Sequence, residues 1–404
     1  MHLGYIIKNI RKHRKIKWED TSIAKNRTLL YRIEKGVESL SERLKPEVYK
    51  NLNIKPELIN CRKEEINDLF MKFKYTLFDF DTKKRHSYLN FNLNNEEYLH
   101  CDNYYLLELM QFIEAALVYP KKMDLDIDEA YNKLKQYDSF PYIYFVYVYY
   151  GRFLKKQNKH KEAIECYERA LLTCSDIQDR CIIYPHLAGE YTYQKRYLKA
   201  LRYMLQVRDI AVEYHVFRRV CDADAQIAFI YCNLGFYDKG IDMCYRTMEN
   251  ESLITAGSMN ILYLNTSFVH LKLNDPDKAY PLLLKAEKYD SNFPELITHF
   301  LYYYVLKNIK TGVDKYYQRA MEQFKVGTLH YRIANLYKAY FDDPASKQAE
   351  ELALEVYMEV GGIEDTISTV FYLDMIINIY KHQKEYQKVI VYMEEKNRLI
   401  EEKK

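Results

Sequence analysis

The sequence is poor in the two residues that most often interrupt helices and form tight turns. Only 11 of its 404 residues are glycine and only 9 are proline. A fold of many short strands needs such residues at its frequent turns, so this composition argues against a strand-rich protein. The hydrophobic content of 48% is sufficient for a core. We therefore predict an all-α fold.

Motifs for catalysis and metal binding are also missing. The eight cysteines contain no C-x-x-C pair, and their spacings match no zinc pattern. The sequence contains no phosphate-binding glycine loop, no dinucleotide-binding glycine motif, no H-E-x-x-H and no G-x-S-x-G. Its 11 histidines are scattered singly. We expect a protein that is not an enzyme and that needs no cofactor and no metal.

No segment predicts export or membrane insertion. The first 17 residues are charged, unlike the apolar core of a signal peptide. The most apolar run, residues 143–150, is far shorter than the roughly 18 residues of a membrane span. The sequence therefore predicts a cytoplasmic protein with reduced cysteines and no membrane partner.

The net charge of +3 is unevenly distributed along the chain. Residues 1–55 carry 14 basic and 6 acidic residues, whereas the remainder carries 46 basic and 51 acidic residues. A basic segment on a mildly acidic body is typical of a nucleic-acid contact confined to one end. The other interpretation is a helical surface that happens to be rich in lysine.

The basic segment has the pattern of a small helical bundle. Apolar residues at positions 3, 6, 7 and 10 predict an amphipathic helix over Leu3–His13. Residues 18–24 can form a second short helix, and a third begins near Asn26 or Thr28 and ends at Gly36. The apolar residues expected to close this bundle are Leu29, Leu30, Ile33, Leu40, Leu44, Val48 and Leu52. Three short helices with a basic third helix are what a helix-turn-helix requires.

These residues resemble a known DNA-binding motif. Leu3-Gly4-x-x-Ile7-x-x-Ile10-Arg11, followed by Arg32-Ile33-Glu34-x-Gly36, resembles the start and end of a Cro/C1-type helix-turn-helix. The continuation to Asn51-Leu52-Asn53-Ile54 is most similar to the version in Rgg-like regulators. The resemblance implies that Glu34 ties helices together and that neighbouring polar residues meet DNA. The implied base-reading residues are Arg27, Thr28, Tyr31 and Arg32, and the implied phosphate contacts are Lys8, Arg11, Lys12 and Lys35.

Two features depart from this motif. The stretch between Arg14 and Ile33 is about two residues shorter than usual, and its turn lacks the usual glycine. A second interpretation therefore stands beside the first, in which residues 1–55 form a three-helix cap that docks on the rest of the chain without binding DNA.

Small residues recur farther along the chain at nearly constant spacing. Ala163, Ala200, Gly240 and Ala279 lie 37, 40 and 39 residues apart. The surrounding pattern resembles the tetratricopeptide repeat, a helix-turn-helix unit of about 34 residues. The longer spacing predicts helices extended by about a turn, as in Rgg-like regulators. The first repeat matches the motif at Tyr147, Tyr150, Gly151, Leu154, Ala163, Tyr167 and Ala170.

The predicted organisation follows from these patterns. Residues 1–55 form a helix-turn-helix domain, and residues 56–140 form divergent helical pairs that begin a right-handed solenoid. Within this second segment we expect helices over residues 59–80 and 104–117, with a loop over residues 79–95. Residues 141–404 form the repeat array and end in a capping helix, with weaker register over residues 295–360.

The first helix of each repeat is expected to line the inner groove of the array. An apolar floor with amide and cationic groups beside it suits an extended peptide, because amides bond the peptide backbone and a cation takes its carboxylate. The predicted peptide contacts are Arg152, Lys155, Phe229, Asn233, Leu264, Asn265, Phe268, Asn378 and Lys381.

Taken together, the sequence resembles the RRNPP-type, peptide-responsive transcriptional regulators of quorum sensing. This resemblance implies a homodimer that binds double-stranded DNA and is switched by a short peptide. The alternative is an adaptor or inhibitor whose array binds a protein partner without DNA. A DNA affinity that decreases with salt would distinguish the first function from the second.

Overall fold

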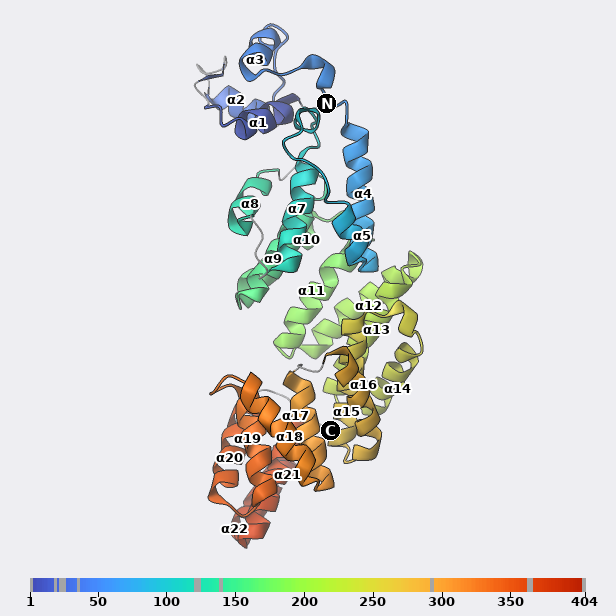
Figure 1. Ribbon diagram of the computed structural model, residues 1–404, viewed down its shortest axis with the longest axis vertical. Coiled ribbons are helices and arrows are strands. Elements are labelled where there is room, and N and C mark those ends of the chain that lie inside the picture. Colours follow the sequence, from blue (N-terminus) through green and yellow to red (C-terminus); the bar gives the residue numbers. More distant parts are fainter. Residues whose placement is uncertain are drawn as a thin grey trace. The chain divides into compact units, whose positions relative to one another are not determined.

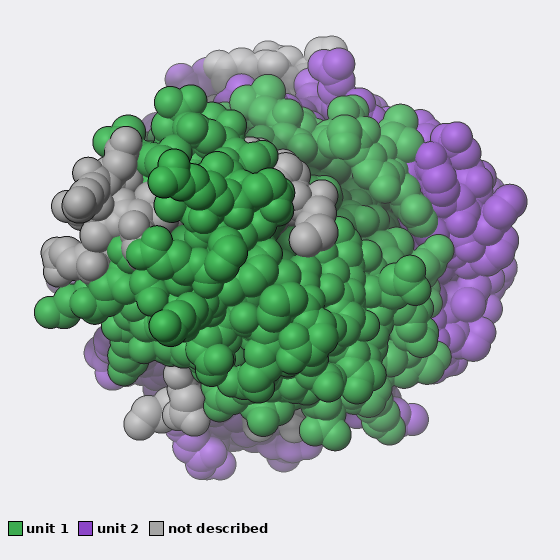
Figure 2. Space-filling view, turned by 90° about the horizontal axis from the view of Figure 1, so that it is seen from above, with its two compact units in different colours: residues 1–190 green, residues 191–404 purple. Residues whose placement is uncertain are grey.

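The computed structural model describes residues 3–17, 20–21, 27–34, 37–119, 125–137, 141–290, 294–361 and 366–401 (Figure 1). Every regular element among these residues is a helix, which confirms the predicted all-α class. Successive helices pair in a tetratricopeptide-like repeat. The chain divides into two compact units, residues 1–190 and residues 191–404, coloured separately in Figure 2. We describe each unit by itself.

The first unit begins with the predicted small bundle. Its helices are α1 (Leu3–His13), α2 (Arg27–Glu34) and α3 (Lys45–Leu52). Leu30 and Ile33 of α2 are buried, as predicted. Gly4 allows α1 to approach α2 closely, because a Cβ atom there would lie 1.7 Å from the Ile33 carbonyl oxygen. The second predicted helix, apart from residues 20–21, and Gly36 lie outside the described residues.

The helices that follow the bundle confirm two predictions and correct one. They are η2 (Pro56–Leu58), α4 (Lys63–Asp79), α5 (Thr82–Ser87), α6 (Glu96–Leu99), α7 (Tyr105–Val118) and α8 (Ile127–Leu134). Helices α4 and α7 match the two expected helices. The expected loop over residues 79–95 is wrong in part, because it contains α5. Asp81 caps α5 by accepting a hydrogen bond from the Lys84 amide, and Arg85 pairs with buried Glu114 at 2.5 Å.

The repeat array begins with α9 (Ile143–Lys156), α10 (His160–Thr173) and α11 (Arg180–Tyr193). In the second unit the helices are α12 (Tyr197–Glu213), α13 (Phe217–Asn233), α14 (Tyr237–Met248), η3 (Glu251–Leu253), α15 (Ala256–Lys272), α16 (Pro276–Tyr289), α17 (Pro294–Lys307), α18 (Lys310–Gln323), α19 (Leu329–Asp342), α20 (Lys347–Gly361), α21 (Thr366–Gln383) and α22 (Tyr386–Glu401). Neighbours in the chain pack as antiparallel pairs, and α13, α15, α17 and α19 also contact one another in that order.

The small residues lie where paired helices cross. Ala163, Ala200 and Ala279 are fully buried, and a Cβ atom on Gly240 would lie 2.4 Å from the sulfur of Cys232. The series continues beyond the residues found in the sequence. Gly312 in α18 is buried, and a Cβ atom there would lie 2.1 Å from the ring of Tyr304; Ala349 in α20 is also fully buried. Close helix crossings therefore recur through α20.

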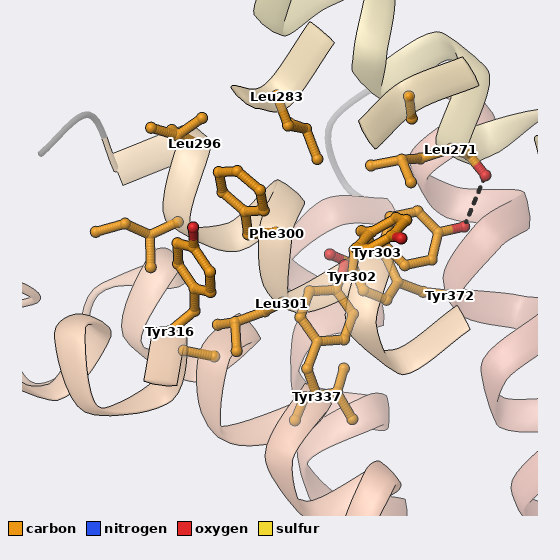
Figure 3. Packing of buried hydrophobic residues seen from close by; sticks show 14 of the residues in the cluster. Leu271, Leu283, Leu296, Phe300, Leu301, Tyr302, Tyr303, Tyr316, Tyr337 and Tyr372 are labelled. Atoms are coloured by element: carbon orange, nitrogen blue, oxygen red, sulfur yellow. Dashed lines mark hydrogen bonds between the residues drawn. The ribbon is translucent and has the colours of Figure 1, made fainter. Parts of the chain in front are cut away.

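Tyrosine fills much of the core of the second unit. Around α17, the rings of Phe300 and Tyr316 stack with centroids 4.3 Å apart, and those of Tyr302 and Tyr337 with centroids 5.7 Å apart (Figure 3). The Tyr302 hydroxyl donates a hydrogen bond to the Leu271 carbonyl oxygen at 3.3 Å. Burial raises the pKa of both Tyr302 and Tyr337. The unusual number of tyrosines, 42, is thus explained in part by rings that pack while their hydroxyls stay bonded.

Candidate functional site

The exposed face of α2 is the first candidate site. Thr28, Tyr31 and Arg32 are exposed on the side of the helix opposite Leu30 and Ile33, and Tyr31 is 55% exposed. This separation follows from the helical period, which places residues 30 and 33 on one face. Three of the four predicted base-reading residues therefore share one solvent-facing surface.

Arg32 has an acidic neighbour on this face. The guanidinium of Arg32 lies 3.3 Å from the carboxylate of Glu38, and both side chains remain well exposed, so solvent screens this pair. The remaining predicted contacts, the side chain of Arg27 and all of Lys35, lie outside the described residues.

The structure contradicts the prediction that Lys8 and Arg11 contact phosphate. Lys8 is 3% exposed, and its ammonium lies 3.7 Å from the centre of the Tyr137 ring, a cation–π contact. Arg11 is buried and donates two hydrogen bonds to Glu34, at 2.6 and 3.1 Å. Glu34 thus ties α2 to α1, as the resemblance implied. The sequence could not reveal that both cations already have partners.

Lys12 lies at the margin of this buried region. It is half-buried, and its ammonium donates a hydrogen bond to the Gln136 side chain at 3.2 Å. Burial lowers the pKa of Lys12, and the nearby positive charges of Lys133 and Arg11 lower it further. Among the three predicted phosphate contacts of α1, only Lys12 is partly accessible to solvent.

The small bundle is fastened to the helices that follow it. Asn9 donates a hydrogen bond to the Cys101 carbonyl oxygen at 3.4 Å and accepts one from the Tyr137 hydroxyl at 3.2 Å. Glu96 joins Arg14 at 2.8 Å and Lys55 at 2.6 Å, and the bond from Lys55 is the main cause of its lowered pKa. The bundle is thus bonded to the following helices both through α1 and Arg14 and through Lys55, at its end.

The predicted peptide contacts are spread over both units. In the second unit, Phe229, Asn265 and Phe268 are partly buried, while Asn378 and Lys381 on α21 are exposed. Leu264 is 3% exposed and belongs to the core, so its prediction is wrong: it lies on the face of α15 that packs inward.

Phe268 is the centre of a cluster that only the fold could reveal. Its ring stacks on the imidazole of His299 from α17 with centroids 4.5 Å apart, and the Lys272 ammonium lies 4.2 Å from the ring centre. Burial, together with the positive charges of Lys272 and of His330 on α19, lowers the pKa of His299 to about 3. His299 is therefore neutral near pH 7 and presents one nitrogen as a donor and one as an acceptor.

Three buried polar atoms of this cluster lack hydrogen-bond partners. They are the amide nitrogen of Asn265 and the Nδ1 atoms of His299 and His330. Buried polar groups are normally bonded, so three such atoms on α15, α17 and α19 mark a place where a ligand or water completes the bonding. We call Asn265, Phe268, Lys272, His299 and His330 the Phe268 cluster.

Asn233 differs from Asn265 in its surroundings. Its amide nitrogen donates to the Phe229 carbonyl oxygen at 2.8 Å, and its oxygen accepts from the Tyr197 hydroxyl at 3.3 Å. An amide with both ends bonded must break an internal bond before it can hold a peptide backbone. Asn265 is therefore the better candidate for that role.

The two predicted contacts of the first unit lie on α9. Lys155 pairs at 3.2 Å with Glu190, whose side chain is fully buried and lies 2.8 Å from the Nδ1 atom of His160. The Nε atom of Arg152 and the hydroxyl of Tyr167 are buried without hydrogen-bond partners. Lys155 thus neutralises the buried carboxylate of Glu190, and the Nε–H group of Arg152 can still donate a hydrogen bond.

The second unit also contains a pocket away from these clusters. A pocket of about 280 Å³ between α12, α13 and α14 contains none of the predicted site residues; it is lined by Arg208, Cys221, Asp224, Lys239, Asp242, Met243, Arg246, Thr247 and Asn250. The residues that the structure describes contain no group of three or more His, Cys, Asp or Glu residues arranged to hold a metal ion. They also contain no helix both long and apolar enough to cross a bilayer.

Comparisons with known proteins identify the fold. No protein-family model matches the sequence, and no curated protein does. Several solved structures are similar. A Rap protein complexed with competence and sporulation factor shares 15% identity over 84% of this chain and 98% of its own, with a TM-score of 0.59. The apo form of the quorum sensor NprR from B. thuringiensis shares 13% identity over 82% and 99%, with a TM-score of 0.56.

A third structure gives the same result. Aspartyl phosphate phosphatase F from Bacillus subtilis shares 13% identity over 83% of this chain and 93% of its own, with a TM-score of 0.51. At such low identity the similarity is one of fold. The chain has the helical-repeat fold of the Rap and NprR structures.

Proposed function

We propose that the protein is a DNA-binding transcriptional regulator of the peptide-responsive RRNPP type. The observation that carries this proposal is the exposed face of α2. Thr28, Tyr31 and Arg32 lie on this face, and the opposite, apolar face of the helix is buried. A helix of this kind reads base edges in the major groove, and neighbouring cations position it on phosphate. The basic charge of residues 1–55 supports the same function.

The proposed signal is a short peptide bound at the Phe268 cluster. An extended peptide offers a carbonyl and an amide at each residue, the groups that the unbonded nitrogens of Asn265 and His299 can bind. The ring of Phe268 supplies an apolar contact, and Lys272 supplies positive charge beside it. Similar structures include a quorum sensor and a Rap protein bound to competence and sporulation factor, which supports a signalling ligand.

Peptide binding would act on DNA binding through the shape of the array. A ligand shifts an equilibrium only if it binds one conformation more tightly than the other. The regulator is proposed to act as a homodimer on a two-fold operator, since paired half-sites match paired reading helices.

Selection from a random duplex library tests DNA binding directly. The full-length protein is expected to enrich one sequence, and its affinity should decrease steeply between about 50 and 200 mM salt, because bound cations release counterions. Arg32→Ala should weaken the selected site by about tenfold or more and flatten its sequence preference. The control Arg43→Ala removes an exposed arginine of the same segment and should keep that preference. Failure to enrich any sequence would refute DNA reading by α2.

An adaptor that binds a protein partner is the second candidate. The burial of Lys8 and Arg11 favours it, because two cations of the basic segment serve internal contacts. Arg14 and Lys55 also pair with Glu96, so two further cations of the basic segment are partly neutralised within the protein. An adaptor would show no salt-dependent affinity for duplex DNA, so the same titration separates the two functions.

A further inference from the structure

Helix α12 carries an apolar stripe on its outer face. Leu198, Leu205 and Val212 recur every seven residues and are 71%, 39% and 47% exposed. The opposite face of the helix is buried in the second unit through Ala200, Met204, Val207 and Ala211. The helix is therefore apolar on two sides. One side is used by the fold, and the other has no covering element among the described residues.

The exposed residues are arranged symmetrically about Leu205. Leu198 and Val212 lie seven residues before and after it, and Tyr193 and Phe217 lie twelve residues before and after it. Tyr193 ends α11 and Phe217 begins α13, and they are 65% and 59% exposed. A sequence that reads alike in both directions along a helix suits pairing with an antiparallel copy of itself.

Two residues of opposite charge lie beside the stripe, nearly symmetrically about Leu205. Arg202 lies three residues before Leu205 and Asp209 lies four residues after it, on one flank of the stripe. Both side chains are exposed, and neither forms an ion pair within the described part of the chain. In an antiparallel pair centred on Leu205, the position opposite Arg202 is Arg208, which already pairs with Asp224 at 2.7 Å. Asp209 lies one residue farther along, on the same flank as Arg202, so a shift of about 1.5 Å brings Arg202 of each copy beside Asp209 of the other. Two pairs of opposite charges then form across the interface, whereas a parallel arrangement of the two helices would not bring Arg202 and Asp209 together.

We infer that the outer face of α12 is a self-association surface, on which a second copy of this chain packs antiparallel about a two-fold axis at Leu205. In this arrangement Leu205 meets Leu205 of the second copy, and Leu198 meets its Val212. Tyr193 and Phe217 extend the contact at both ends. The inference stands on α12 and its flanks, and it is independent of DNA and peptide binding.

The size of the surface sets the expected affinity. Helix α12 spans 17 residues, roughly 26 Å, so the helix alone gives a contact smaller than the approximately 800 Å² per partner of a standard interface, and the flanking rings add only their own area to it. Small interfaces of this kind are transient, and we expect a dissociation constant on the order of micromolar.

Sedimentation velocity of the full-length protein over about 1 to 200 µM tests the surface. The protein should move from monomer to dimer in this range. Leu205→Glu places two carboxylates together on the axis and should weaken the dimer by about 100-fold or more. Leu172→Glu, at an 87% exposed leucine of α10, is the matched control and should leave the dimer unchanged. Circular dichroism should show that both variants keep their helices.

A charge exchange tests the antiparallel direction. Arg202→Asp and Asp209→Arg should each weaken the dimer, and the double variant should restore it, because the two charges of each pair are then reversed together. A monomer throughout the concentration range would overturn the inference. So would a dimer that survives Leu205→Glu, or one that dissociates equally with Leu172→Glu. A double variant that stays weak would overturn the pairing of Arg202 with Asp209.

Discussion

Gly312 offers the most direct test of the close helix crossings. A methyl group at this position would lie 2.1 Å from a ring carbon of Tyr304, whereas nonbonded carbon atoms prefer about 3.5–4.0 Å. The ring must therefore move by about 1.5 Å to reach normal contact. Its movement is restricted, because the ring contacts those of Tyr303 and Tyr316, with centroids 5.0 and 5.7 Å away.

The expected loss of stability follows from two opposing effects. Overpacking in a core of fixed rings costs about 1–3 kcal/mol. Alanine favours the helix over glycine by about 1 kcal/mol, which offsets part of this cost. We expect Gly312→Ala to lower the free energy of unfolding by about 1 kcal/mol, a fall in Tm of about 2–4 °C for a unit of roughly 200 residues.

A second glycine provides the control. Gly257 also lies in the first turn of a helix, α15, and a Cβ atom there would meet nothing within 4 Å. Gly257→Ala should leave the protein as stable as before or more stable by up to about 1 kcal/mol. Thermal and urea unfolding followed by circular dichroism would compare the two. Equal stability of both variants would show that α17 and α18 do not cross as closely as described.

Three further predictions concern the two candidate sites. Glu34→Gln leaves the buried Arg11 guanidinium without its counter-charge, so urea unfolding should show a loss of about 3–5 kcal/mol; an unchanged midpoint would refute the buried pair. Because the pKa of His299 is lowered to about 3, the unfolded chain binds a proton there more readily below pH 6.5. The contribution of His299 to stability should therefore be complete above that pH and should decrease as the pH falls toward 3. In His299→Gln, thermal melts should show a smaller loss of stability over this pH range. A variant with the same pH profile as the original protein would refute a neutral, buried His299. Asn265→Ala should abolish the effect of the peptide on DNA binding, while Asn132→Ala, at an exposed asparagine of α8, should not; equal responses in a binding assay would move the peptide site away from the Phe268 cluster.

The sequence predicted the helices well where the local pattern carried the information. The stripe of Leu3–His13 matches α1, and the small residues from Ala163 to Ala279 mark real helix crossings. The later crossings were harder to find, because Gly312 follows Ala279 by only 33 residues and the pattern of neighbouring aromatics changes there. Helix α5 was missed because its apolar content is low and its stability depends on Asp81 and on Arg85 pairing with a distant helix.

The candidate sites were less predictable, for a physical reason. The partners that bury Lys8 and Asn9 lie about 90 to 130 residues away, at Cys101 and Tyr137, and no local pattern reports them. The same holds for His299, whose stacking on Phe268 joins two different repeats. Exposure on α2 could be predicted, since it follows from the period of a single helix.

The fastening of the small bundle limits how this protein could search for its operator. A DNA-reading head on a loose tether can follow a half-site that is displaced along the duplex. Here α1 is bonded on one side to α2 through Glu34 and on the other to Cys101 and Tyr137. Each base pair inserted between two half-sites moves one of them by about 3.4 Å and turns it by about 35° around the helix axis. A head held in this way cannot follow that displacement by moving on the first unit unless buried bonds break. The spacing between half-sites would then be recognised together with their bases, to the extent that the first units of the two copies are held in place.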